Sequence, residues 1–186
     1  MKLTKIKETA LAAMFLALGL LLPILTGPEL GMILLPMHIP VFLCGLILGP
    51  KYGFAVGFVV PLMRSAIFGF PIMFPMALSM AVELAAYGLI SGFLYSAIKK
   101  WQIREHGFSK IIDIWGALIP SMIIGRIIWG LAMFGLLAFG GGRFTFAAFL
   151  TGAFTAAGPG IIIQLMLIPA LVAALERTGL VPLWRI

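Results

Sequence analysis

The sequence predicts an all-α integral membrane protein, a bundle of six transmembrane helices, and composition, length and charge distribution support this fold class. Hydrophobic residues make up 62% of the chain and charged residues 10%, against roughly 45–50% and about 25% in soluble domains. The 186 residues suffice for about six apolar spans of roughly 20 residues each. Little remains for a soluble domain, so residues 1–186 are predicted to form a single membrane domain.

Glycine, proline and polar residues separate the apolar runs and mark the helix ends. The predicted helices are Thr9–Leu25, Pro36–Gly49, Tyr52–Phe68, Met73–Ile98, Ile111–Phe139 and Thr145–Leu175. The first run is followed by LLPILTGPELG rather than by a small-residue cleavage site, so we expect a helix and not a signal peptide. The last run should break near AAGPG, because Pro159 lacks a backbone donor and glycines flank it.

The basic residues predict how the helices are oriented. With the N-terminus inside, the inner tails and connections contain ten basic residues, namely Lys2, Lys5, Lys7, Lys51, Lys99, Lys100, Arg104, Lys110, Arg177 and Arg185. The outer loops contain only Arg143. By the positive-inside rule, both termini are expected in the cytoplasm. The same rule explains the net charge of +7 better than a nucleic-acid-binding face, since the basic residues lie in short connections.

Motifs for catalysis and metal binding are absent from the sequence. The single Cys44 excludes an intramolecular disulfide and a CxxC site, and a small buried apolar residue is its simplest interpretation. The chain contains no GxxxxGK[ST] loop, no GxSxG motif and no HExxH motif. We therefore expect no enzyme, no metal site and no cofactor on this chain. A channel is not expected either, because the inner third of every predicted helix is nearly free of polar side chains.

Five polar side chains, each from a different predicted helix, are expected at a similar depth in the outer half of the membrane. They are His38, Arg64, Glu83, Arg126 and Gln164. Counted from inner charged residues at about 1.5 Å per residue, the three charged groups lie about 20–24 Å above the inner surface. His38 and Gln164 fall at about 20 Å and about 18 Å by the same count. The sequence therefore predicts one polar site to which five helices contribute.

The charges of this predicted site favour an anionic guest. A charge near the bilayer centre costs about 2.5–3.5 kcal/mol on insertion scales, so such side chains rarely face lipid. Arg64 and Arg126 supply two positive charges, and Glu83 returns one negative charge. The remaining cation needs a partner, and a carboxylate would pair with a guanidinium through two parallel hydrogen bonds. The alternative is a buried ion-pair network that only ties the helices together.

Hydroxyl and aromatic residues next to these charges fit a binding pocket. One face of the fourth predicted helix carries Ser79, Glu83 and Tyr87, which are spaced four residues apart. Trp129 lies one turn after Arg126 on the next predicted helix. For Tyr87 and Trp129, packing or anchoring at the membrane interface is an equal alternative. His38 could simply end the first outer loop, and no second histidine or cysteine near it supports a metal site.

Small residues form a stripe on the first predicted helix. Thr9, Ala13 and Ala17 repeat at four-residue spacing, which lets another helix approach closely. Such a stripe serves packing within one protein or docking of a partner chain.

Several segments together resemble the substrate-binding S-components of energy-coupling factor (ECF) vitamin transporters. They are TGPELGMILLPMHIPV, GPKYGFAVGFVVPLMRSAIFGFPIMFPMALSMAVELAAYGLISGFLY, GRIIWG and PGIIIQLMLIPALV, and the resemblance extends over essentially the whole chain. It implies capture of a vitamin from outside a bacterial cell membrane. It also implies a transmembrane coupling subunit and two cytoplasmic ATPase partners that use the ATP. Ala13 and Ala17 resemble the AxxxA motif by which the family docks on the coupling subunit.

The segments around Arg64 and ELAAYG look most like the pantothenate group of S-components, and pantothenate carries a single carboxylate. The resemblance then implies contacts to the carboxylate from Arg126 and Arg64, to hydroxyl or amide groups from Glu83 and Tyr87, and a polar contact from Gln164. The outer loop from Glu29 to His38 would act as a lid over the site. An S-component for hydroxymethylpyrimidine, riboflavin or another vitamin remains the nearest alternative, followed by a self-sufficient small-solute carrier.

Overall fold

The computed structural model describes residues 5–101 and 107–177, and in these ranges every regular element is a helix and no strand occurs. The elements are α1 Lys5–Leu34, α2 His38–Leu48, α3 Pro50–Phe68, the π-helical turn η1 Met73–Ala77, α4 Leu78–Trp101, α5 Gly107–Phe139, α6 Phe146–Leu150, the π-helical turn η2 Thr151–Thr155 and α7 Gly158–Arg177. The predicted all-α class is therefore confirmed.

Five segments of the described residues are long and apolar enough to cross a membrane. They are Lys5–Gly27, Pro50–Phe68, Met73–Lys100, Lys110–Phe139 and Phe146–Leu175. The second predicted span differs, because α2 has only 11 residues and is about 16 Å long, whereas the hydrocarbon core is about 30 Å thick. All of its residues except Ile39 are buried. The structure thus supports five of the six predicted spans by length and makes α2 a core helix of the bundle.

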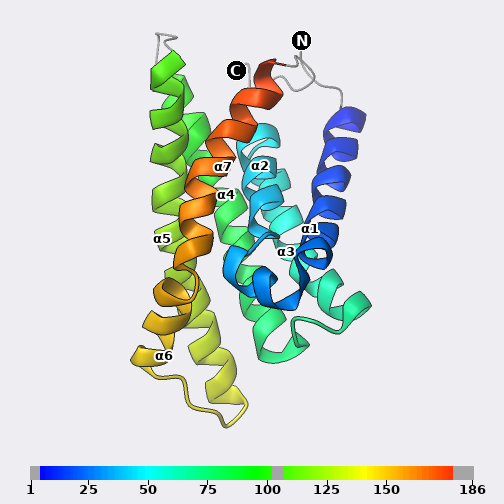
Figure 1. The fold of residues 1–186 in the computed structure, drawn as a ribbon, viewed down its shortest axis with the longest axis vertical. Helices are drawn as coiled ribbons and strands as arrows, with labels where there is room; N and C mark the ends of the chain where they lie inside the picture. The colour runs from blue at the N-terminus through cyan, green and yellow to red at the C-terminus, as the bar shows by residue number, and fades with distance from the viewer. Residues whose placement is uncertain (1–4, 102–106, 178–186) are drawn as a thin grey trace.

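Counted with the short α2, successive helices from α1 to α5 and then α7 run in alternate directions, and the start of α1 lies at the same end of the bundle as the end of α7 (Figure 1). α4 lies at the centre and packs against α2, α3 and α5. α7 packs against α1, α2 and α5 and so closes the bundle. The main core joins the buried face of α2 to Tyr87 and Tyr95 of α4, Leu118 of α5 and Ile168 of α7.

Glycines allow α2, α3 and α4 to approach one another closely. A Cβ atom added to Gly53 of α3 would lie 2.7 Å from the Cα of Gly45 on α2 and 2.8 Å from the carbonyl carbon of Gly88 on α4. A Cβ added to Gly92 would lie 2.6 Å from the carbonyl oxygen of Gly45. Real side chains do not fit at such distances, so this three-helix junction depends on residues without side chains.

The segment predicted as the first outer loop is more helical than expected. α1 continues to Leu34 across a kink at Gly27, where the backbone angles are φ 73° and ψ 172°. Leu35 follows in a left-handed conformation, with φ 48°, and the connection to α2 is short. The predicted lid from Glu29 to His38 is therefore a helical turn and a tight connection, although the Glu29 side chain lies outside the described part.

The last predicted helix is interrupted, as expected. Ala156 and Ala157 form a turn, and α7 begins at Gly158, directly before Pro159. Pro159 lies in the first turn of α7, where its missing N–H costs no intrahelical bond. The segment before the break is itself divided into α6 and η2.

Basic residues lie at the end of the bundle where α1 begins (Figure 1). Lys5 and Lys7 open α1, Lys51 opens α3, and Lys99 and Lys100 close α4. This grouping agrees with the reasoning behind the predicted orientation. Which end faces the cytoplasm stays a prediction.

Candidate functional site

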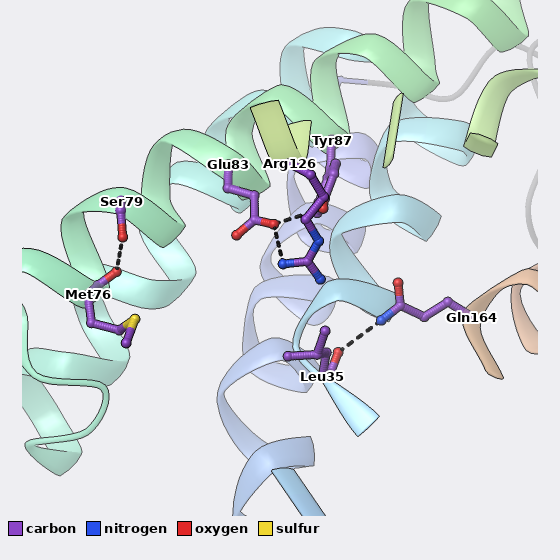
Figure 2. A network of polar contacts seen from close by, with 7 residues as sticks. All are labelled: Leu35, Met76, Ser79, Glu83, Tyr87, Arg126 and Gln164. Atoms are coloured by element: carbon purple, nitrogen blue, oxygen red, sulfur yellow. Dashed lines mark hydrogen bonds and ion pairs between the residues drawn. The ribbon is translucent and has the colours of Figure 1, made fainter. Parts of the chain in front are cut away.

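An ion pair between α4 and α5 forms the centre of the candidate site (Figure 2). Arg126 Nη1 lies 2.9 Å from Glu83 Oε1, and the hydroxyl of Tyr87 donates to the same oxygen at 2.8 Å. Glu83 and Tyr87 are each 1% exposed and Arg126 is 6% exposed. Because the pair is buried, removing either charge would leave the other without a counter-ion, at a large cost in stability.

The backbone of α5 makes room for Tyr87. Its ring lies directly against Gly125, where any side chain would overlap the ring atoms. Tyr87 is four residues after Glu83, so both project from the same face of α4. Gly125 therefore allows the phenol to reach the carboxylate next to Arg126.

Aromatic rings of α2 cover Tyr87 from the other side. The His38 ring centroid lies 5.5 Å from that of Tyr87 in a tilted arrangement, and the Phe42 ring stacks on Tyr87 at 4.8 Å. His38 and Phe42 are separated by four residues and share one face of α2. Phe42 was missed in the sequence analysis, although this spacing from His38 could have indicated it.

Three buried atoms of the cluster have no hydrogen-bond partner, namely His38 Nδ1, His38 Nε2 and Arg126 Nε. His38 is only 1% exposed. Buried polar atoms are nearly always hydrogen-bonded in native proteins, to the protein or to ordered water. These atoms are therefore the ones that a bound guest can satisfy, with the imidazole offering a donor and an acceptor in its neutral form.

Gln164 connects α7 to the end of α1. Its Nε2 donates to the carbonyl of Leu35 at 3.4 Å, and the side chain is buried. One turn earlier, Gly160 lies against the backbone of Ile33 and Leu34. In Figure 2, the Arg126 guanidinium extends from Glu83 towards the side on which Leu35 and Gln164 lie. The amide is thus near the polar cluster but is bonded to the connection between α1 and α2.

Arg64 has its own partners. Its Nη1 donates to the carbonyl of Leu20 on α1 at 3.0 Å, and its guanidinium lies 5.5 Å from the ring centroid of Phe68. The residue is 8% exposed. The structure therefore directs this arginine to α1, and its hydrogen bond does not join it to Glu83 or Arg126.

Trp129 belongs to a second cluster, which α5 forms with the segments after it. Its ring meets Phe144 edge-on at 5.9 Å and stacks with Phe149 at 6.4 Å. Met133 and Ala153 complete this cluster. The predicted position one turn after Arg126 is correct, but the indole contacts the α6 segment.

Ser79 is fully buried, yet its hydroxyl is used locally. It donates to the carbonyl of Met76 at 2.8 Å, where η1 passes into α4. The predicted common face of Ser79, Glu83 and Tyr87 is buried along its length.

The small-residue stripe lies on the outer surface of α1. Ala13 and Ala17 are exposed, whereas Ala12 and Phe15 face the bundle. The stripe therefore takes no part in packing within the described chain and remains accessible to a partner.

These contacts bring together Glu83, Tyr87, Arg126 and His38. Gln164 joins them only through the Leu35 carbonyl, which also accepts from the backbone N–H of His38. The structure turns Arg64 and Trp129 to other neighbours. Their predicted roles in binding stay predictions.

Comparison with known proteins identifies the family. The family model described as "ECF transporter, substrate-specific component" matches residues 7–172 of the 186. No curated protein and no solved structure matches the chain. The matched range includes every residue of the polar cluster and the whole small-residue stripe. The family is one of transporter components and not of enzymes.

Proposed function

Because the chain belongs to the family of substrate-specific components of ECF transporters, we propose that it captures pantothenate outside the cell for ATP-driven uptake. The observation that carries this proposal is the buried Arg126 beside Glu83 and Tyr87, with an unsatisfied Nε. A guanidinium with a free N–H edge is suited to a carboxylate. The sequence resemblance to the pantothenate group adds independent support.

Each polar group of the cluster has a proposed task. Arg126 binds the carboxylate, His38 supplies a hydrogen bond from its unsatisfied ring nitrogens, and Tyr87 and Glu83 contact hydroxyl or amide groups. Gln164 contributes from α7, where it also holds the connection after α1. For Arg64 and Trp129, contact with the guest stays a prediction from the sequence, since the hydrogen bond and ring contacts described above direct them to other neighbours.

We place the docking surface for the transmembrane coupling subunit on α1, at Ala13 and Ala17. Both are exposed, and small side chains allow close helix approach. The two ATPase subunits of the transporter would hydrolyse ATP, since this chain has no nucleotide-binding loop. In the bacterial cell membrane, the end rich in lysine would face the cytoplasm, with both termini there.

A second candidate is an S-component for an uncharged ring compound such as hydroxymethylpyrimidine or riboflavin. One observation favours it: Glu83 already neutralises Arg126, and His38, Tyr87 and Phe42 form an aromatic wall beside the pair. A flat, neutral ring would stack there without adding charge.

The test is calorimetric titration of the purified, detergent-solubilised chain with pantothenate, hydroxymethylpyrimidine and riboflavin in separate runs. The proposal predicts saturable binding of one pantothenate per chain, and the first runs are paired with mass spectrometry of small molecules extracted from the protein. Stoichiometric binding of one of the ring compounds, with no heat from pantothenate, would replace the proposal by the second candidate.

A further inference from the structure

The Glu83–Arg126 pair has a consequence for the charge of the guest. Resting on the proposed function, we propose that Glu83 is a specificity-determining residue. It keeps the empty site electrically neutral, so that an acidic guest binds to Arg126 only together with one proton, which Glu83 takes up.

The geometry allows two acids on one guanidinium. Arg126 uses Nη1 for Glu83 Oε1 at 2.9 Å, while its Nε has no partner. A guanidinium carries five N–H donors in a rigid plane, so its Nε edge can donate to a second carboxylate while Nη1 keeps its bond to the first. The guest and Glu83 would then be neighbours on the same cation.

The charges do not balance in such a complex. One guanidinium cannot neutralise two carboxylates, and like charges that share a buried site lead one of them to bind a proton. Glu83 is the candidate, because it is 1% exposed and already accepts the Tyr87 hydroxyl on one oxygen.

No other described cation is directed to the pair. The ionisable or polar groups predicted for this site, helix by helix, are Tyr87 on α4, Arg126 on α5, His38 on α2, Arg64 on α3 and Gln164 on α7, and of these Tyr87 and Arg126 contact Glu83. Of these, Arg64 is bonded to the Leu20 carbonyl of α1, and Gln164 is uncharged. Lys110 and Asp113 lie on α5 at least 13 residues before Arg126, or about 20 Å away along the helix. As long as Arg64 stays at its α1 carbonyl, the compensating charge is therefore a proton taken up from solvent.

A guest without the carboxylate imposes no such demand. Its binding leaves the Glu83–Arg126 pair as it is in the empty chain, and no proton is exchanged. Pantothenate and pantothenyl alcohol, in which a hydroxymethyl group replaces the carboxylate, are therefore a matched pair of probes.

The experiment measures proton uptake by the wild-type chain. Binding enthalpies are determined for both compounds at one pH in phosphate and in Tris, whose ionisation enthalpies differ. We expect uptake of about one proton per pantothenate and none for the alcohol, and pantothenate affinity that falls about tenfold per pH unit while Glu83 is ionised in the empty site. Pantothenate binding without proton uptake overturns the inference and leaves the proposed function intact. If neither compound binds, both the inference and the proposed function are overturned.

The variant Glu83→Gln tests whether Glu83 is the group that takes up the proton. It keeps an acceptor for the Tyr87 hydroxyl but removes the charge, so pantothenate should bind with no proton uptake and no dependence of affinity on pH. Glu8→Gln is the matched control, because Glu8 accepts a hydrogen bond from Tyr52 where α1 begins and should leave the proton count at about one. Undiminished uptake in Glu83→Gln would place the proton on another group, His38 foremost, and overturn the inference. Should this variant fail to fold, the wild-type proton count decides alone.

Discussion

Removing one member of the Glu83–Arg126 pair should destabilise the chain far more than removing both. Glu83→Ala leaves Arg126 buried at 6% exposure without a counter-ion, and breaking a buried pair in this way costs about 3–5 kcal/mol. It also leaves the Tyr87 hydroxyl without its acceptor, which adds about 1–3 kcal/mol. Arg126→Ala leaves Glu83 buried without a counter-ion, at a similar cost in unfolding free energy. The double variant leaves neither charge unpaired.

The measurement is a double-mutant cycle on unfolding free energies in detergent micelles, from the wild type, both single variants and the double variant. The double variant should be more stable than the sum of the single effects predicts by at least about 3 kcal/mol. The hydrogen bond from Tyr52 to Glu8, with its 3.2 Å separation and partial exposure, serves as the reference pair through Tyr52→Phe and Glu8→Ala, and its coupling should stay near about 1 kcal/mol. Additive effects at Glu83 and Arg126, or a coupling no larger than that of the reference pair, would refute the buried ion pair.

Three further predictions concern binding and transport. Arg126→Lys keeps the positive charge but loses the planar fork, so pantothenate affinity measured by calorimetry should fall at least about tenfold; undiminished affinity would remove the arginine from the site. Gly125→Ala places a methyl group against the ring of the hydrogen-bonded tyrosine and should lower both stability and affinity. Gly135→Ala, on the same helix where a Cβ meets nothing within 4 Å, should lower neither, and equal effects of the two would contradict the packing argument. Ala13→Trp combined with Ala17→Trp should abolish uptake into vesicles containing the complete transporter while calorimetric binding stays unchanged; normal uptake would contradict docking on α1.

Much of the fold follows from the sequence because the membrane imposes simple rules. Long apolar runs interrupted by Gly, Pro and charged residues predicted the five long helical segments and the break before Pro159. The second predicted span is not confirmed, because hydropathy reports how apolar a segment is and not how long its helix will be. α2 ends at Leu48 and is enclosed by its neighbours. The long first helix was not predicted because Gly27 and Pro28 indicate a helix boundary in the sequence, whereas the structure has only a kink at Gly27.

The ion pair agrees with the prediction that Glu83 and Arg126 lie at one level of the bundle, but the direction of each side chain could not be predicted from the sequence. Counting residues from the inner charges gives the height of a side chain above the membrane surface, but the direction it points around its helix depends on how neighbouring helices pack. Arg64 reaches a carbonyl of α1 rather than Arg126 for this reason. Trp129 faces Phe149 because the chain folds back after α5 and brings α6, the start of the last predicted helix, against the indole. Contacts within one helix, such as that of Glu83 with Tyr87, could be predicted from their four-residue spacing alone.

Substitutions at the glycine junction of α2, α3 and α4 should fail for a different reason from those in the polar cluster. Around Arg126, replacements fail for reasons of charge and hydrogen bonding, and a compensating change elsewhere can restore the balance. At Gly45, Gly53 and Gly88 the backbones themselves are in contact, so every larger residue forces helices apart and no second-site change makes room. A saturation library selected only for folded protein should therefore lose all variants at these glycines, although none of them belongs to the polar cluster.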